Sequence, residues 1–165
     1  MKKFELTTDT KMLLGRKLFR IKALISFGNV GAGDMGGYIE KEENLSQSGN
    51  AWVYGDARVS GNAKVSGDAE VSGDAKVSGN AEVSGNAWVH GNAWVSGNAK
   101  VSGDAEVYGN AWVSGNAKVS GDAEVSGDAE VYGNAKVSGN AEVSGNADYA
   151  TASGFGSEYR TTTFF

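Results

Sequence analysis

The sequence contains no cysteine and no proline, and both absences exclude classes of protein. Without cysteine the chain forms no disulfide and no thiolate metal site, so nothing in it indicates an oxidising compartment. Without proline, and with glycine spaced at six residues rather than three, it is not a collagen-like triple helix.

Histidine is almost as scarce, since His90 is the only one in 165 residues. Zinc-dependent carbonic anhydrase chemistry needs several histidine ligands, which one subunit cannot supply. We therefore expect no metal and no other cofactor.

Strong net charge and long apolar runs are also missing. The net charge of −5 is mild, so we expect no direct binding of nucleic acid. The most apolar stretch, LFRIKALISF, contains Arg20 and Lys22 and is too short to span a bilayer. The start MKKFELTTDT has no apolar run behind it and is not a secretory signal. We expect no membrane association and a cytoplasmic location.

One six-residue unit fills the middle of the chain. Glycine recurs at every sixth residue from Gly49 to Gly145, in the unit G-[N/D]-A-x-V-[S/Y/H]. The alternation Ala-x-Val is typical of a strand with one buried face, which points Ala and Val inward and x outward. Gly, Asn and Asp suit a sharp corner between strands. Because one unit alone buries almost nothing, the repeat predicts a solenoid of stacked coils rather than a disordered linker.

The pattern divides the chain into three parts. Residues 1–48 are predicted to form an N-terminal cap, residues 49–148 the repeat, and residues 149–165 a C-terminal cap or truncated tail. A first coil exposes strand edges and core, so it needs a cover. The apolar side chains predicted to provide this cover are Phe4, Leu6, Met12, Leu13, Leu14, Leu18, Phe19, Ile21, Leu24, Ile25 and Phe27.

The unit V-S-G-N-A-x resembles the hexapeptide pattern of left-handed parallel β-helices. The resemblance implies an all-β triangular solenoid with three hexapeptides per coil, between five and six coils, and a small β-rich cap before it. Successive coils then stack at about 4.8 Å, the ordinary strand spacing.

The flanking segments narrow the resemblance. The stretch RKLFRIKALISFGNVGAGDMGGYIEKEENLSQSGNAWVYGDARV is similar to the start of hexapeptide-repeat proteins common in tailed phages and prophages. Those proteins are often labelled transferase or polymer-forming cytoskeletal protein. The tail GFGSEYRTTTFF also resembles a stretch of them. The resemblance implies the cytoplasm of a bacterial host cell, or a virion-associated protein as the alternative.

With three units in each coil, every third unit falls on the same face, and the outward residues sort into three columns. The first column holds Trp52, Glu70, Trp88, Glu106, Glu124 and Glu142. The second holds Arg58, Lys76, Trp94, Trp112, Glu130 and Asp148, and the third holds Lys64, Glu82, Lys100, Lys118 and Lys136. One face is thus predicted to be acidic with aromatics and another basic. Either the charges only keep the prism solvated, or opposite faces of different copies attract.

Aromatic residues at outward positions, together with those at the corner position after the valine, are the candidate interface, since a contiguous exposed cluster usually marks a contact surface. The candidate residues are Trp52, Tyr54, Trp88, His90, Trp94, Tyr108 and Trp112. The expected partner is a second copy of the chain, with a homotrimer favoured because related folds pack along their faces, or else a host or phage protein.

Three functions follow from this interpretation. The favoured one is a non-catalytic phage-type scaffold or protein-binding module. The first alternative is a phage-encoded inhibitor of a host defence or DNA-handling protein, suggested by the acidic column. The second is an acyltransferase, since such enzymes with this repeat use a histidine base. His90 lies in an uninterrupted repeat without an inserted loop, so we assign no catalytic residue.

Overall fold

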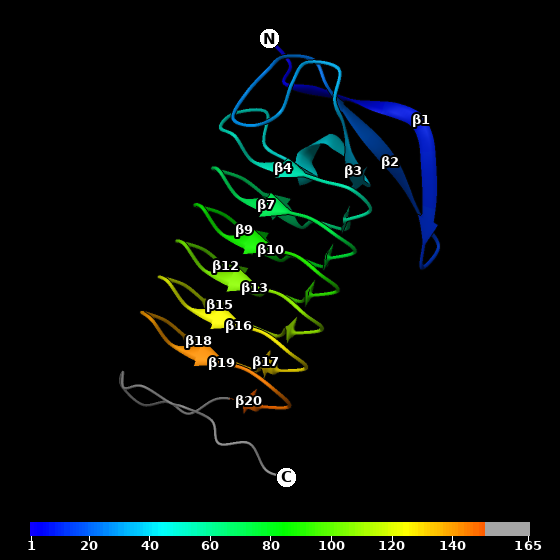
Figure 1. Ribbon diagram of the computed structural model, residues 1–165. Helices are drawn as coiled ribbons and strands as arrows, with labels where there is room; N and C mark the ends of the chain where they lie inside the picture. Colours follow the sequence, from blue (N-terminus) through cyan, green and yellow to red (C-terminus); the bar gives the residue numbers. More distant parts are fainter. Residues whose placement is uncertain (151–165) are drawn as a thin grey trace.

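The computed structural model describes residues 1–150 of the chain, and its architecture is an all-β solenoid with a β-rich N-terminal cap (Figure 1). The cap region contains the strands β1 (Phe4–Leu13), β2 (Arg16–Ala23) and β3 (Met35–Ile39) and the short 3-10 helix η1 (Glu42–Asn44). No helix among these described residues is long and apolar enough to cross a membrane.

The solenoid follows with strands of two or three residues. In chain order they are β4 (Trp52–Val53), β5 (Arg58–Val59), β6 (Lys64–Val65), β7 (Glu70–Val71), β8 (Lys76–Val77), β9 (Glu82–Val83), β10 (Trp88–Val89), β11 (Trp94–Val95), β12 (Lys100–Val101), β13 (Glu106–Val107), β14 (Trp112–Val113), β15 (Lys118–Val119), β16 (Glu124–Val125), β17 (Glu130–Tyr132), β18 (Lys136–Val137), β19 (Glu142–Val143) and β20 (Asp148–Ala150). At three strands per coil this makes between five and six coils, as predicted.

The strands form three sheets, one for each face of the prism, in which the solenoid strands pair in parallel (Figure 1). The second sheet also includes the antiparallel pairs β1–β2 and β2–β3. The first face is the sheet β4-β7-β10-β13-β16-β19. The second runs β1-β2-β3-β5-β8-β11-β14-β17-β20, and the third is β6-β9-β12-β15-β18. Each solenoid strand pairs with the strand one full coil further along the chain, so that Trp88 lies opposite Glu106. The three predicted columns are therefore confirmed, while the left hand of the coil stays a prediction.

The six-residue unit explains this geometry directly. Its alanines and valines fill the inside of the prism, and from Ala51 to Val131 each of them is buried. Each unit turns at its glycine, which has a positive φ at every corner from Gly49 to Gly145. At Gly97 an added Cβ would lie 2.9 Å from the backbone N of Gly115 in the next coil, so the coils stack too closely there for any side chain.

One corner carries a hydrogen-bonded ladder of asparagine side chains. In this ladder the amide Nδ2 of one coil donates to the Oδ1 of the next, at 3.0–3.2 Å. Its members are Asn62, Asn80, Asn98, Asn116 and Asn134. Because the other two corners mix Asn with Asp, only this corner is continuous.

The cap covers the exposed edge of the first coil, where no earlier coil is present to pair with it. Strand β3 pairs in parallel with β5, so the chain already follows the solenoid path inside the range predicted as cap. The buried amide of Asn44 donates to the carbonyl oxygens of Gly61 and Ala63. The buried Lys3 ammonium donates in the same way to the carbonyl oxygens of Gly49 and Ala51, at 3.3 and 2.8 Å.

The antiparallel pair β1–β2 forms an arm that leaves the cap and runs down beside the solenoid (Figure 1). Ion pairs Lys11–Asp56 and Arg16–Glu40 hold it. Its tip turns at Leu14 and Gly15, both with positive φ. The prediction that Met12 and Leu14 cover the first coil is wrong, because both are exposed, Leu14 at 86%. They lie at the far end of the arm, whereas Phe4 and Ile21 near its base are buried as predicted, and so is Leu18, which pairs with Lys11 closer to the tip. The same prediction is wrong for Leu24, which is 40% exposed.

We expect Gly97→Ala to lower the free energy of unfolding more than Gly55→Ala does. Both glycines have positive φ, which costs a residue with a Cβ about 1–3 kcal/mol. The Cβ at Gly55 would meet nothing closer than 3.7 Å, whereas the one at Gly97 collides with backbone and adds roughly 1–3 kcal/mol of overpacking. Urea unfolding measures the difference, and equal losses would contradict the close stacking.

A second expectation concerns pH. Burial lowers the pKa of Lys3 from 10.5 to about 8, and the carboxylate of Asp68 opposes this shift. The folded protein thus loses a proton near pH 8 that the unfolded chain keeps to about 10.5, so stability rises with pH across this interval. Relative to Lys3→Met, the wild type should gain on the order of 2 kcal/mol between pH 7 and pH 10.5. The exposed Lys2→Met is the control and should follow the wild type.

Candidate functional site

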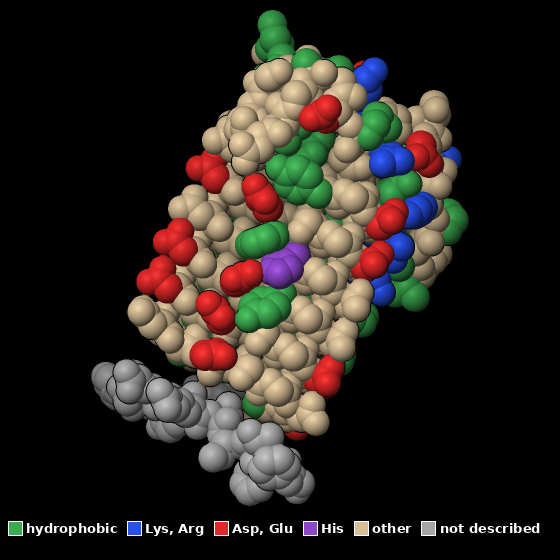
Figure 2. Space-filling model, in the orientation of Figure 1, with side chains coloured by type: hydrophobic (Ala, Val, Ile, Leu, Met, Phe, Trp, Pro, Cys, Tyr) green, Lys and Arg blue, Asp and Glu red, His purple; other side chains and the backbone are tan. Residues whose placement is uncertain are grey.

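The outward positions of the three faces, and the corner position after each valine that holds Ser, Tyr or His, carry the candidate site. Figure 2 shows acidic side chains gathered around the single histidine, on the side of the molecule that it displays. Two separate aromatic groups occur on these faces, one on the first and one on the second.

The first-face cluster consists of Trp88, His90 and Tyr108. The His90 ring lies between the other two, 4.1 Å from the Trp88 ring and stacked at 5.1 Å on the Tyr108 ring. His90 and Tyr108 are one full coil apart in the sequence, so they occupy the same corner position in successive coils. The Trp88 Nε1 donates to the Ser72 hydroxyl at 3.0 Å, and 43% of the Trp88 side chain remains exposed.

Carboxylates border this cluster. The Nε2 of His90 and the Oε1 of Glu106 share a hydrogen bond of 2.6 Å. The Tyr108 hydroxyl donates to Glu124 at 3.4 Å. Glu106 thus orients the imidazole of His90. The pair lies on an open face, and no group of three His, Cys, Asp or Glu among residues 1–150 could hold a metal ion.

The second-face stack consists of Trp94 and Trp112. Their rings are 5.2 Å apart and nearly parallel, at 10°. Each indole Nε1 donates to a serine hydroxyl of the preceding coil at 3.0 Å, Trp94 to Ser78 and Trp112 to Ser96. Trp112 keeps 38% of its surface exposed, whereas Trp94 is half-buried and lies across a groove from the tip of the arm.

The remaining two predicted interface residues lie near the cap. Trp52 points outward from its coil, as the unit requires, but it is only 1% exposed. The rings of Phe4 and Phe27 pack edge-on against it, so the prediction that Trp52 forms part of an exposed surface is wrong. Tyr54 is half-buried against the core. Burial, and next the nearby Glu70 carboxylate, raise the pKa of the Tyr54 hydroxyl.

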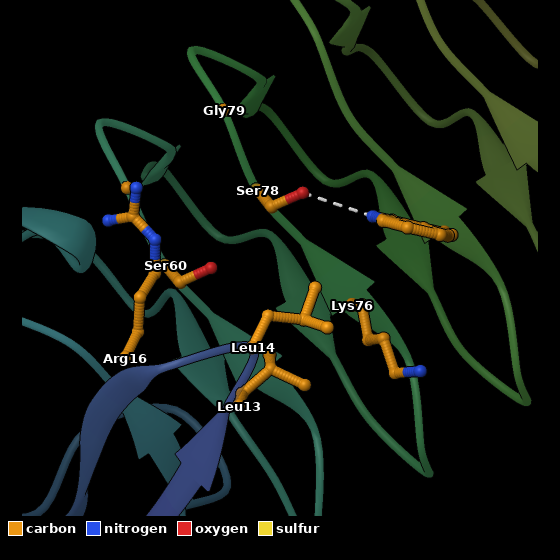
Figure 3. Close-up of a pocket in the computed structure, with 9 residues that line it drawn as sticks. Leu13, Leu14, Arg16, Ser60, Lys76, Ser78 and Gly79 are labelled. Carbon is orange, nitrogen blue, oxygen red and sulfur yellow. Dashed lines mark hydrogen bonds between the residues drawn. The ribbon is translucent and has the colours of Figure 1, made fainter.

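A groove of about 390 Å³ separates the tip of the arm from the second face. Its walls are Leu13 and Leu14 on one side and Lys76 and Trp94 on the other (Figure 3). Sequence reasoning missed this groove because it assigned both leucines to the cover of the first coil. The available signal was the Leu14-Gly15 pair, which marks a turn inside an otherwise strand-like stretch.

Comparison with known sequence families places most of the chain in one of them. The sequence family described as "Bactofilin: Polymer-forming cytoskeletal" matches residues 42–151. This range takes in η1 and every strand from β4 to β20, and leaves out the arm. No curated protein matches the chain.

We expect Trp94 and Trp112 to be energetically coupled, because their stacked rings should contribute about 0.5–1.5 kcal/mol beyond the area that they bury. In a urea-unfolding double-mutant cycle, the double variant Trp94→Ser/Trp112→Ser should lose less stability than the sum of the two single losses. Trp88 and Trp112 form the control pair and should be additive, since the Trp88 ring contacts His90 rather than a second indole. Additive losses for Trp94 and Trp112 would contradict the stacked geometry.

Proposed function

The chain belongs to the bactofilin family of polymer-forming cytoskeletal proteins, and from this premise we propose that it is a non-catalytic scaffold that assembles with copies of itself. The family description is structural rather than enzymatic. A parallel solenoid also suits this role, because a strand edge at its end can accept a further strand.

The observation that carries the proposal is the difference between the two ends of the solenoid. At the N-terminal end, β3, Lys3 and Asn44 occupy the edge of the first coil. At the other end, β18, β19 and β20 are the outermost strands of their sheets, with no neighbour beyond them among residues 1–150. The core shows there too, since Ala141 and Ala147 are only partly buried. We propose that a second copy stacks on this last coil.

We further propose a phage or prophage origin and a location in the cytoplasm of a bacterial host, or in the virion. Support comes from the similarity of residues 16–59 and of the tail to proteins of that kind. A homotrimer packed along the faces stays a prediction.

Two other functions have one observation each in their favour. The ladder Glu106, Glu124 and Glu142 gives the first face an acidic surface that an inhibitor of a basic host protein would use. The lysines on the third face count against such a role. The hydrogen-bonded pair of His90 and Glu106 would suit acyl transfer. The groove beneath the arm does not include this pair. If the protein turned over an acyl-CoA and His90→Ala abolished that turnover, the chain would be an enzyme instead.

The end contact is tested with Ala141→Asp, which places a carboxylate on the open end of the core. We expect this variant to remain unassembled at concentrations where the wild type forms end-to-end particles, because a charge cannot be buried there without a partner. Ser144→Asp adds the same charge on the exposed corner nearby and should assemble normally. Sedimentation velocity and electron microscopy give the readout. A wild type that stays monomeric at every concentration would overturn the proposal.

A further inference from the structure

Two ladders of like charge run down different faces of the same coils. On the third face, Lys100, Lys118 and Lys136 are direct cross-strand partners, and all three are exposed. On the first face the direct partners are Glu106, Glu124 and Glu142. Like charges directly opposite one another destabilise a sheet, so each ladder is unfavourable unless opposite charge lies over it.

The chain itself supplies little of that opposite charge. Lys100 forms an ion pair with Glu82 at 3.1 Å, and Glu106 contacts His90. Within the described part of the chain, neither Lys118 nor Lys136 forms an ion pair, and Glu142 forms none either. The lower halves of both ladders are thus free to meet charge from outside.

The two faces match each other in order. The third column reads Lys64, Glu82, Lys100, Lys118, Lys136. One unit further on in each case, the first column reads Glu70, Trp88, Glu106, Glu124, Glu142. Every lysine thus corresponds to a glutamate, and the one glutamate corresponds to the one tryptophan. Corresponding residues differ in height by only a third of a coil, about 1.6 Å at a ~4.8 Å strand spacing.

We propose that the third face of one copy binds the first face of a second copy, side by side, with the two solenoid axes parallel and the coils in register. This contact rests on the proposed self-assembly and names a second surface for it. It places four lysines against four glutamates and brings no like charges together. The lysine and glutamate ladders have the same spacing between successive side chains, because the same repeat builds both faces. Lysines and glutamates therefore stay opposite one another along the whole prism.

The charge order also selects the parallel orientation. If the second copy were inverted about the Lys100–Glu106 level, Glu82 would face Glu124. Lys118 would then face Trp88 and lose its counter-charge. Inversion about the Glu82–Trp88 level avoids a repulsive pair, but it places only two lysines opposite glutamates. The parallel arrangement places all four lysines opposite glutamates, and charge patterns of this kind usually fix orientation and register at an interface.

The same contact accounts for the exposed first-face cluster. Trp88 would be covered by the partner's third face, opposite a glutamate that Lys100 already neutralises. An aromatic centre with charged residues around it is ordinary interface anatomy. Because the contact joins two different faces, a bound pair keeps one first face and one third face unused, so further copies can add in rings or rows.

The test exchanges the charges. Lys118→Glu/Lys136→Glu makes both faces acidic, and Glu124→Lys/Glu142→Lys makes both basic. We expect each variant alone to lose side-by-side assembly, and an equimolar mixture of the two to regain it. The control Lys17→Glu/Lys22→Glu changes the net charge by the same amount as Lys118→Glu/Lys136→Glu, but on the arm, and should assemble as the wild type does. Sedimentation velocity should also show that added salt weakens the wild-type contact. Failure of the mixture to assemble would overturn the proposal.

Orientation can be tested by cross-linking, because the chain contains no cysteine of its own. Under oxidation, a mixture of Lys118→Cys and Glu124→Cys should give the mixed disulfide dimer. A Lys118→Cys and Trp88→Cys mixture should give little, and the reverse result would overturn the parallel arrangement.

The end contact is separable from this one. Ala141→Asp should keep side-by-side assembly, and Lys118→Glu/Lys136→Glu should keep end-to-end assembly. If the wild type forms particles only one solenoid wide, and the charge-reversal variants form the same particles, the lateral contact is overturned. The proposal of a self-assembling scaffold would still stand.

Discussion

The close stacking of one coil on the next is the constraint on which the rest of the molecule depends. At interior corners such as Gly97 the backbone of the following coil lies where a Cβ would be. The chain must therefore place glycine in the left-handed conformation at a fixed spacing, and this spacing sets the strand length, the three faces and the alanine and valine core. A single inserted residue would displace every later side chain from its face.

In a stack of this kind, each interior coil finds hydrogen-bond partners for its backbone on the coils before and after it, and only the two end coils lack a neighbour. The N-terminal cap solves the problem with two side chains, Lys3 and Asn44, whose nitrogen atoms donate to carbonyl oxygens of the first coil. Burial of the charged Lys3 side chain is unfavourable, and it lowers the pKa of Lys3 to about 8. The last described coil has no comparable cover among residues 1–150. This asymmetry connects the fold to the polymer-forming family in which the chain is placed.

Because glycine, alanine and valine are fixed by the stack, only the outward position and its neighbour are left to carry function. They hold two like-charge ladders, a stacked pair of indoles and a histidine between two aromatic rings. Each of these is built by repetition from one coil to the next, so a feature that is weak in one coil is multiplied along the face. A surface of this kind suits binding to another repetitive surface, and a second copy of the chain offers one.

The sequence by itself determined the repeat and the inward and outward positions, since a period of six with alternating burial leaves little freedom. The three columns came from the resemblance to β-helices with three hexapeptides per coil. The sequence also located Trp88, Trp94 and Trp112 at outward positions, and His90 and Tyr108 at the corner position beside them. Only the tertiary structure decided what lies over those positions. Trp52 is buried because Phe4 and Phe27 reach it from the cap, and Leu13 and Leu14 line a groove because the arm folds back along the second face. Such contacts join residues far apart in a part of the chain without a repeat, where no local pattern specifies the partner.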